Sequence, residues 1–431
     1  MGCDKNRVDS EKLLSIIKSS GAEICDDLQE VQILVINTCA FLNESREEAI
    51  NTVLDCSVYK SHKLEKIVLT GCLPQKFIGD IYKPLVEADV FLGTEDYGKF
   101  FEALELAYNN ERVNYVGYGV ADYCFNRVLT TPAHYAYLKI ADGCNNKCTY
   151  CLIPKIRGKY VSYQIEDLIK ETLNLGEISE LILVAQDVTR YGIDLYGQKK
   201  LTELLKEITK LENVKSVRIL YCYPDMIDDE LIAEISQNPK IIKYLDIPLQ
   251  HSEDTILRLM NRRGNRQAYS DLLRKLRTKI AGIAVRSTFI TGFPGETKED
   301  FEGLCDFVRQ SRFENCGFFA FSREPETPAY KLKGQLKSSV KNFRVGKLYE
   351  IQSAISSEKL KAYVGNYLRV ICDGIDYEKN CFVGRAYFQA PDIDGKVYFN
   401  ANHAVQGEYY DVLIERSDEY DLFGRSGDYE L

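Results

Sequence analysis

The sequence lacks a signal peptide and lacks any apolar run long enough to cross a membrane. We therefore predict a cytoplasmic protein with no membrane partner. Because disulfides are rare in a reducing compartment, the 14 cysteines are not expected to pair with one another, and clustered thiols should be ligands. The chain also lacks a basic surplus: its net charge is −9 and its pI is near 5.3, which argues against a general nucleic-acid surface.

The length and composition indicate a multidomain globular protein. At 431 residues the chain has room for two to three domains. A hydrophobic content of 45% and a mean hydropathy of −0.26 are typical of a folded, soluble chain.

The first segment reads as a small parallel α/β domain over residues 1–107, followed by a linker over 108–129. Short apolar runs alternate there with charged helical stretches, a pattern typical of βαβ units. The expected strands are 31–36, 66–70 and 88–92.

The second segment, residues 130–361, repeats this alternation six times. We predict a wound sheet or partial (βα)6 barrel with its sites at the C-terminal strand ends, closed by a polar helix over 338–361. The expected strands are 137–140, 181–185, 216–221, 244–247, 284–290 and 316–321.

The third segment, residues 363–431, changes to strand-like runs separated by Gly and Asp turns. This pattern predicts a small antiparallel β-barrel. The segment holds 13 acidic and 6 basic residues, so its net charge of −7 carries most of the charge of the chain. The expected strands are 367–371, 381–386, 396–399 and 409–414.

Three cysteines, Cys144, Cys148 and Cys151, form a CxxxCxxC triplet directly after the first strand of the second segment. Three thiolates can hold three irons of a 4Fe-4S cluster and leave the fourth iron open to a small molecule. The alternative is a zinc knuckle. Zinc would require a fourth Cys or His nearby, and the closest histidine, His134, lies ten residues upstream.

Three further cysteines, Cys3, Cys39 and Cys72, each follow a turn or the end of an expected strand. The C-terminal ends of parallel strands lie along one edge of a sheet, so these thiols can converge despite their separation in sequence. They predict a second three-thiolate site. For each one alone, the alternative is a small buried hydrophobic side chain.

These features resemble the radical S-adenosylmethionine (SAM) methylthiotransferases over nearly the whole chain. That family has an N-terminal three-cysteine domain, a radical SAM core and a C-terminal TRAM barrel. The cysteine triplet is followed by IPKIRG at 153–158. Further matching motifs, in the same order as in the family, are Gln186-Asp187, DIPLQH at 246–251, RRG at 262–264, TGFPGET at 291–297, and Phe321-Ser322-Arg323 with Thr327-Pro328-Ala329.

The family has two branches, one modifying adenosine in transfer RNA and one modifying an aspartate of small-subunit ribosomal protein twelve. The start Gly2-Cys3-Asp4-Lys5-Asn6 and the run APDIDG at 390–395 resemble the ribosomal-protein branch. A barrel with a net charge of −7 would repel RNA and attract a basic ribosomal protein. We therefore expect a protein substrate and no direct RNA binding through the barrel.

The resemblance implies two 4Fe-4S clusters and SAM as cofactors. Cys144, Cys148 and Cys151 would hold the cluster whose open iron binds SAM, and a 5′-deoxyadenosyl radical would abstract hydrogen from the β-carbon of the aspartate. Cys3, Cys39 and Cys72 would hold the auxiliary cluster that carries the sulfur. The implied partners are the ribosomal protein, an electron donor such as flavodoxin or ferredoxin, and a sulfur donor. Two alternatives remain at this point: a transfer-RNA methylthiotransferase, and a non-catalytic Fe-S or zinc scaffold.

Several other residues of these motifs could have either a functional or a structural role. Gln186 and Asp187 could meet SAM at a strand end, and His251 could be functional or structural. Arg157 and Arg262 could pair with substrate carboxylates or form surface ion pairs. The family also carries a strand before the Gly-Cys turn, where this sequence has only Met1, so we expect either an earlier start or a domain without that strand.

Overall fold

The computed structural model describes residues 2–117 and 126–427. Its N-terminal part is a four-stranded parallel sheet in the order β1-β2-β3-β4, with helices on both faces. Apolar clusters on the two sides of the sheet form the core. The elements are α1 (Asp4–Ser19), β1 (Ile33–Thr38), α2 (Asn43–Ser57), β2 (Lys66–Gly71), α3 (Cys72–Ile81), β3 (Val90–Leu92), α4 (Phe100–Tyr108) and β4 (Val113–Tyr115).

The fourth strand lies in the stretch expected to be a linker, so the sheet extends beyond residue 107. Strand β4 has only three residues, which are buried, exposed and half-buried in turn. It is therefore too short to give a periodic signal in the sequence. The rest of that stretch overlaps residues 118–125, which lie outside the described part of the chain.

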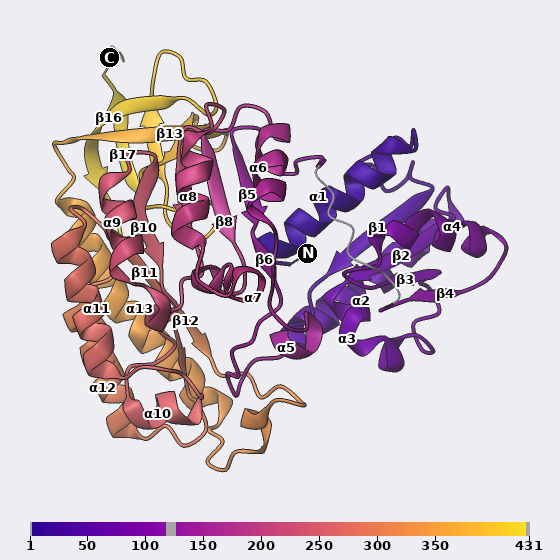
Figure 1. Ribbon diagram of the computed structural model, residues 1–431, viewed down its shortest axis with the longest axis horizontal. Helices are drawn as coiled ribbons and strands as arrows, with labels where there is room; N and C mark the ends of the chain where they lie inside the picture. The colour runs from indigo at the N-terminus through magenta and orange to yellow at the C-terminus, as the bar shows by residue number, and fades with distance from the viewer. Residues whose placement is uncertain (1, 118–125, 428–431) are drawn as a thin grey trace.

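The middle part is an open six-stranded parallel sheet in the order β12-β11-β10-β9-β8-β5. All six expected strands are present within a few residues of their predicted bounds, and the predicted partial barrel is confirmed. Helices cover its outer face (Figure 1). The strands are β5 (Tyr135–Lys139), β8 (Glu180–Val184), β9 (Val217–Ile219), β10 (Ile241–Asp246), β11 (Ala284–Thr291) and β12 (Asn315–Ala320).

The main helices of this core alternate with its strands. Their apolar faces pack on the sheet in the largest hydrophobic cluster of the protein. They are α6 (Ile165–Asn174), α8 (Leu201–Lys210), α9 (Asp229–Gln237), α11 (Arg266–Lys279), α12 (Lys298–Ser311) and α13 (Ser338–Lys361). Shorter elements lie in the loops: β6 (Ala141–Asp142), α5 (Ile153–Ile156), β7 (Val161–Ser162), α7 (Ile193–Tyr196) and α10 (Asp254–Leu259).

The C-terminal part is a closed barrel in the order β13-β14-β15-β17-β16. The barrel was predicted, but its purely antiparallel form is wrong, because β15 and β17 pair in parallel. The last strand was also missed, since its sequence LFGRS combines a glycine with a charged residue. The strands are β13 (Tyr367–Asp376), β14 (Cys381–Arg385), β15 (Val397–Asn400), β16 (Tyr409–Ser417) and β17 (Leu422–Ser426).

Helix α1 joins the N-terminal sheet to the core. It packs against β1 and β5, and Figure 1 shows it between the two sheets. The carboxylate of Asp4 accepts a hydrogen bond from the Tyr221 hydroxyl at 2.7 Å, and the ammonium of Lys5 lies 3.3 Å from the centroid of the Tyr221 ring. On the opposite side, Arg385 of the barrel pairs with Glu180 of β8 at 2.6 Å. In residues 2–117 and 126–427, no helix has the length and apolar character that a membrane span requires.

Candidate functional site

The Cys144–Cys148–Cys151 loop leaves the C-terminal end of β5 through a turn that only glycine can form. Gly143 has φ +71°, and a Cβ atom there would lie 2.0 Å from the carbonyl oxygen of Lys159. The next amide, that of Cys144, donates a hydrogen bond to the carbonyl of Gly158 at 3.2 Å. The two sides of the loop are therefore held together by backbone.

The three thiols are half-buried and lie close enough together for their charges to interact. Burial raises the pKa of Cys144 to about 11 and that of Cys151 to about 12. The charge of Cys148 contributes to both of these raised pKa values. Backbone amides oppose this: Asn146 donates to the Cys144 sulfur and Ile153 to the Cys151 sulfur, each at 3.4 Å. A bound cation would deprotonate such thiols, because the thiolate is the ligand form.

Tyr223 and Arg262 line the Cys148 side. The hydroxyl of Tyr223 lies 3.3 Å from the Cys148 sulfur, and the guanidinium of Arg262 stacks 3.9 Å from the Tyr223 ring centroid. Arg262 is 8% exposed, and its Nε has no hydrogen-bond partner among the described residues. The surface ion-pair reading of Arg262 is therefore wrong. An unpaired buried donor beside a cysteine triplet suits a site that holds a polar ligand.

Gln186 and Asp187 support the loop from the end of β8. Asp187 is buried and accepts hydrogen bonds from Asn146 at 3.0 Å and from Arg190 at 2.9 Å. Gln186 donates to Asp142 at 3.0 Å, and its Oε1 is buried without a partner in the described structure. These contacts give Asp187 a role in fixing the cysteine loop, and they leave Gln186 Oε1 available to a ligand.

Cys3, Cys39 and Cys72 lie along the C-terminal edge of the N-terminal sheet, as their positions in the sequence predicted. Cys3 is the N-cap of α1, Cys39 follows β1, and Cys72 is the first residue of α3. Helix N-termini carry partial positive charge and favour thiolates, so two helices favour the ligand form at this edge.

The thiol of Cys72 lies near enough to Cys3 and Cys39 for their charges to affect its pKa. The pKa of Cys72 is raised to about 11, mainly by burial, and the charges of Cys3 and Cys39 contribute to this rise. The charge of Arg157 and its hydrogen bond to the thiol act in the opposite direction.

The surroundings of Cys72 suit a bound polar group. Tyr97 Oη, Thr70 Oγ1 and Asn37 Oδ1 are buried, and none has a hydrogen-bond partner in the described part of the chain. Buried polar atoms are rarely left unpaired, so this edge has the capacity to hold a group such as a cluster. Within residues 2–117 and 126–427, however, no group of three or more His, Cys, Asp or Glu residues is arranged so that it could hold a metal ion.

The sequence matches three family descriptions in chain order. Residues 1–93 match "Uncharacterized protein family UPF0004", residues 138–308 the Radical SAM superfamily, and residues 364–426 the TRAM domain. Over its full length the chain is 44% identical to the ribosomal protein uS12 methylthiotransferase RimO of Lachnoclostridium phytofermentans, and 43% identical to that of a Thermoanaerobacter strain. Each match covers 98% of this chain and 98% of the relative.

The chain belongs to the RimO family. Its fold is also similar to the radical SAM methyltransferase TsrM from Kitasatospora setae, solved with cobalamin and a [4Fe-4S] cluster bound. The TM-score is 0.55 at 13% identity, with 76% of this chain and 74% of that chain covered. At that identity the likeness shows the fold alone.

A buried ion network joins the two cysteine sets in this RimO-family chain. Arg157, which follows the triplet, pairs with Asp9 of α1 at 2.7 Å and with Asp142 at 3.0 Å. Lys139, at the end of β5, pairs with the same two carboxylates. Arg157 is 7% exposed, so the surface ion-pair reading is wrong for this residue too. No sequence motif pointed to Tyr97 or Tyr223, which are distant from the cysteines in the chain.

Two other motif residues, His251 and Gly292, follow β10 and β11. His251 is fully buried, accepts a hydrogen bond from the Glu253 amide at 3.1 Å, and lies 3.7 Å from Glu296. Gly292 has φ +74°, and a Cβ there would lie 2.5 Å from the Lys341 side chain. These residues shape the loop after β11.

The acidic run of the barrel is partly internal. Asp394, in the motif typical of the ribosomal-protein branch, is buried and accepts a hydrogen bond from Tyr244 at 2.7 Å and pairs with Arg286 at 3.3 Å. The motif thus joins the barrel to the core. Most other acidic side chains described in the barrel are exposed, so its outer surface stays negative.

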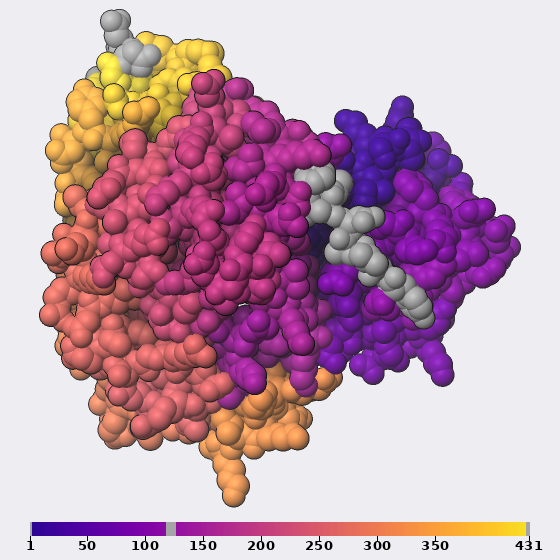
Figure 2. Space-filling view, in the orientation of Figure 1, coloured from indigo at the N-terminus to yellow at the C-terminus, as the bar shows by residue number. Residues whose placement is uncertain are grey.

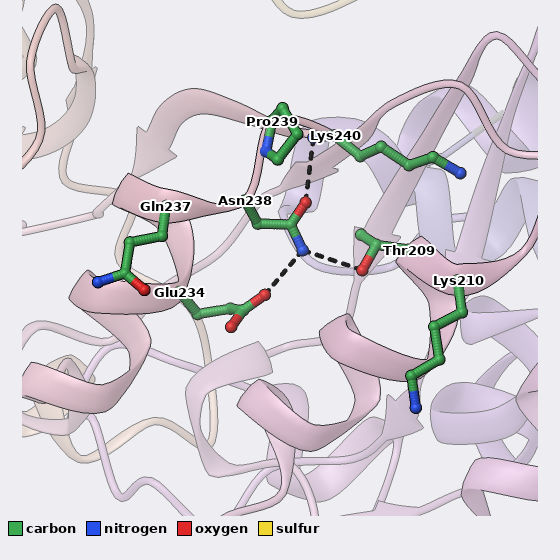
Figure 3. Close-up of a pocket in the computed structure, with 7 residues that line it drawn as sticks. All are labelled: Thr209, Lys210, Glu234, Gln237, Asn238, Pro239 and Lys240. Carbon is green, nitrogen blue, oxygen red and sulfur yellow. Dashed lines mark hydrogen bonds between the residues drawn. The ribbon is translucent and has the colours of Figure 1, made fainter.

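A surface depression between the ends of α8 and α9 lies away from this site (Figure 3). Asn238 fills it by donating hydrogen bonds to Thr209 at 3.0 Å and to Glu234 at 2.7 Å. Because α8 and α9 end where β9 and β10 are about to begin, the depression is at the N-terminal edge of the sheet. The cysteine triplet is at the other edge.

Proposed function

We propose that this protein is a radical SAM methylthiotransferase that adds a methylthio group to the β-carbon of an aspartate in ribosomal protein uS12. The observation that carries the proposal is the likeness to RimO relatives over 98% of the chain. The two sets of three cysteines support it, because the reaction must add both a sulfur atom and a methyl group.

Cys144, Cys148 and Cys151 would hold a 4Fe-4S cluster whose fourth iron is free for SAM, and Cys3, Cys39 and Cys72 would hold a second cluster. When bound, the first cluster and SAM supply a carbon radical able to break an unactivated C–H bond. The protein supplies the surroundings: Tyr223 and Arg262 enclose the Cys148 side, and the contacts of Asp187 and Gly158 fix the loop.

The reaction also requires an electron donor such as flavodoxin or ferredoxin, and a donor of sulfur. We propose both as separate partners in the cytoplasm. The transfer-RNA alternative is not favoured, because the relatives carry the uS12 name and the barrel surface is acidic.

The test is in vitro modification of uS12. Anaerobically reconstituted protein, SAM, sulfide and dithionite are incubated with purified uS12, and the product is analysed by tandem mass spectrometry. We expect one methylthio group on one aspartate, and two SAM molecules consumed for each product. Methylthioadenosine in transfer RNA with unmodified uS12 would support the alternative enzyme, and intact SAM would support the scaffold.

A further inference from the structure

A basic segment packs on the cysteine loop. Residues 327–349 contain six basic and no acidic residues, in a chain with a net charge of −9. The amide of Ala329 donates a hydrogen bond to the Thr149 carbonyl at 2.9 Å, between Cys148 and Cys151. In Figures 1 and 2 the segment, drawn in orange, projects from the end of the core that carries α5 and α10. The segment therefore flanks the proposed active site.

Three of its lysines have no role in holding the fold. Lys331, Lys333 and Lys337 are exposed, and within the described residues none of them forms an ion pair. The other basic residues differ, since Lys341 and Arg344 are buried against neighbouring groups and Lys347 pairs with Glu350 at 2.7 Å. Helix α13 begins next to Lys337 with no acidic residue in its first turn, so the helix dipole adds to the positive charge.

Exposed aromatic side chains lie among these charges. Phe343 is 70% exposed and Tyr330 is 37% exposed, with the Arg323 guanidinium 4.3 Å from the Tyr330 ring centroid. Cations interleaved with exposed aromatic side chains are typical of surfaces that bind single-stranded nucleic acid. A basic protein such as uS12 would be repelled here and attracted to the acidic barrel.

We propose that residues 327–349 bind RNA of the small ribosomal subunit. The lysines contact phosphates, and the aromatic side chains stack on unpaired bases. The choice of ribosomal RNA rests on the proposed function, since uS12 belongs to a particle built on RNA. The natural substrate is then uS12 within a ribosomal particle, and the free protein is a poorer one.

The test compares two triple variants of the full-length, reconstituted protein. Lys331, Lys333 and Lys337 are changed to Gln in one, and Lys206, Lys210 and Lys298, exposed on helices elsewhere, are changed to Gln in the matched control. Binding to purified small subunits is measured at several salt concentrations, and modification is measured on small subunits and on free uS12. Each phosphate contact contributes about 0.7 to 0.9 to the slope of log affinity against log salt.

For the first variant, we expect the slope of log affinity against log salt to become shallower by about 2 to 3. At low salt it should bind subunits at least about tenfold more weakly. Its modification of free uS12 should be retained. The control variant should match wild type. An unchanged slope, an equal loss in the control, or an equal loss on free uS12 would overturn the proposal. Binding does not depend on turnover, so absence of methylthio transfer by wild type would count against the proposed function and leave this result interpretable.

A second, independent observation concerns Arg157, which the core places beside the auxiliary cysteines. Its guanidinium donates to Asn6 at 3.1 Å and pairs with Asp9 at 2.7 Å, both on the helix that Cys3 caps, and it lies close to Cys72. The carbonyl of the next residue, Gly158, accepts the hydrogen bond of the Cys144 amide. Arg157 and its neighbour Gly158 thus contact the surroundings of both thiol sets.

We infer that Arg157 is a positioning residue through which the core sets the reduction potential of the cluster held by Cys3, Cys39 and Cys72. A fixed positive charge in a poorly solvated site favours the more negative, reduced state, and Asp9 acts with the opposite sign. This inference rests on the proposed auxiliary cluster.

The experiment uses full-length protein in which Cys144, Cys148 and Cys151 are alanine, so that only the auxiliary cluster contributes. The midpoint potential is measured by EPR-monitored titration, with iron content as a second readout. In this parent protein, we expect Arg157→Gln to lower the midpoint potential and Asp9→Asn to raise it. Arg157→Lys should leave the potential close to that of the parent.

Opposite shifts distinguish an electrostatic role from loss of packing, which would move both variants the same way. Shifts of the same sign, or none, overturn the inference. If Arg157→Gln fails to hold iron, Asp9→Asn decides alone: a raised potential supports the inference and an unchanged one overturns it. Absence of any cluster in the parent would instead refute the proposed auxiliary site.

Discussion

Replacing Cys144, Cys148 or Cys151 by alanine is expected to abolish reductive cleavage of SAM. Two remaining thiolates cannot hold a cluster that requires three cysteine ligands and leaves one iron open. Without that open iron, SAM cannot bind to the cluster and receive an electron from it. We expect the rate of 5′-deoxyadenosine formation to fall by at least a thousandfold, to background, as it does when a mechanism loses an essential cofactor. The measurement is chromatographic quantification of 5′-deoxyadenosine after incubation with SAM and dithionite.

The matched control is Cys381→Ala. Cys381 is a half-buried thiol of the barrel, with the same exposure class as the triplet cysteines. It should retain full cleavage and full iron content. If a triplet variant still cleaved SAM at the wild-type rate, the triplet would not be the SAM site.

The order of elements could be predicted from the sequence wherever apolar runs are long and buried on both faces. Strands β5 and β8 of the core meet this condition most closely, because all five residues of each are buried in a parallel sheet covered by helices. The three-residue β4 and the polar β17 do not, and both were missed. The parallel pairing of β15 with β17 depends on barrel closure, which no local pattern encodes.

The cysteines of the candidate site could be proposed from the sequence because clustered thiols, and thiols at strand ends, are rare. Their partners could not. Tyr223 follows β9, Asp9 is on α1, and Arg262 follows α10, so only the folded chain brings them to the thiols. The surface reading of Arg157 and Arg262 failed for the same reason: burial of an arginine depends on carboxylates and rings that are distant in sequence.

Replacing Cys39 or Cys72 by alanine is expected to separate the two halves of the reaction. Cys72 is 8% exposed at the start of α3 and Cys39 follows β1, on a different sheet from the triplet, so the radical SAM loop should remain intact. Iron content should fall from about eight to about four atoms per chain, since one of two clusters is lost. SAM cleavage should persist, while transfer of the methylthio group to uS12 should fall below detection.

The control for this prediction is Cys56→Ala, a half-buried thiol on α2 in the same part of the chain. It should keep about eight irons and full transfer. Iron analysis, 5′-deoxyadenosine formation and mass spectrometry of uS12 are measured on the same preparations. Unaltered transfer by Cys72→Ala would remove the auxiliary cluster from the reaction. Loss of SAM cleavage together with transfer would instead show that the two cysteine sets form one functional unit, coupled through the buried network of Asp9, Asp142, Lys139 and Arg157.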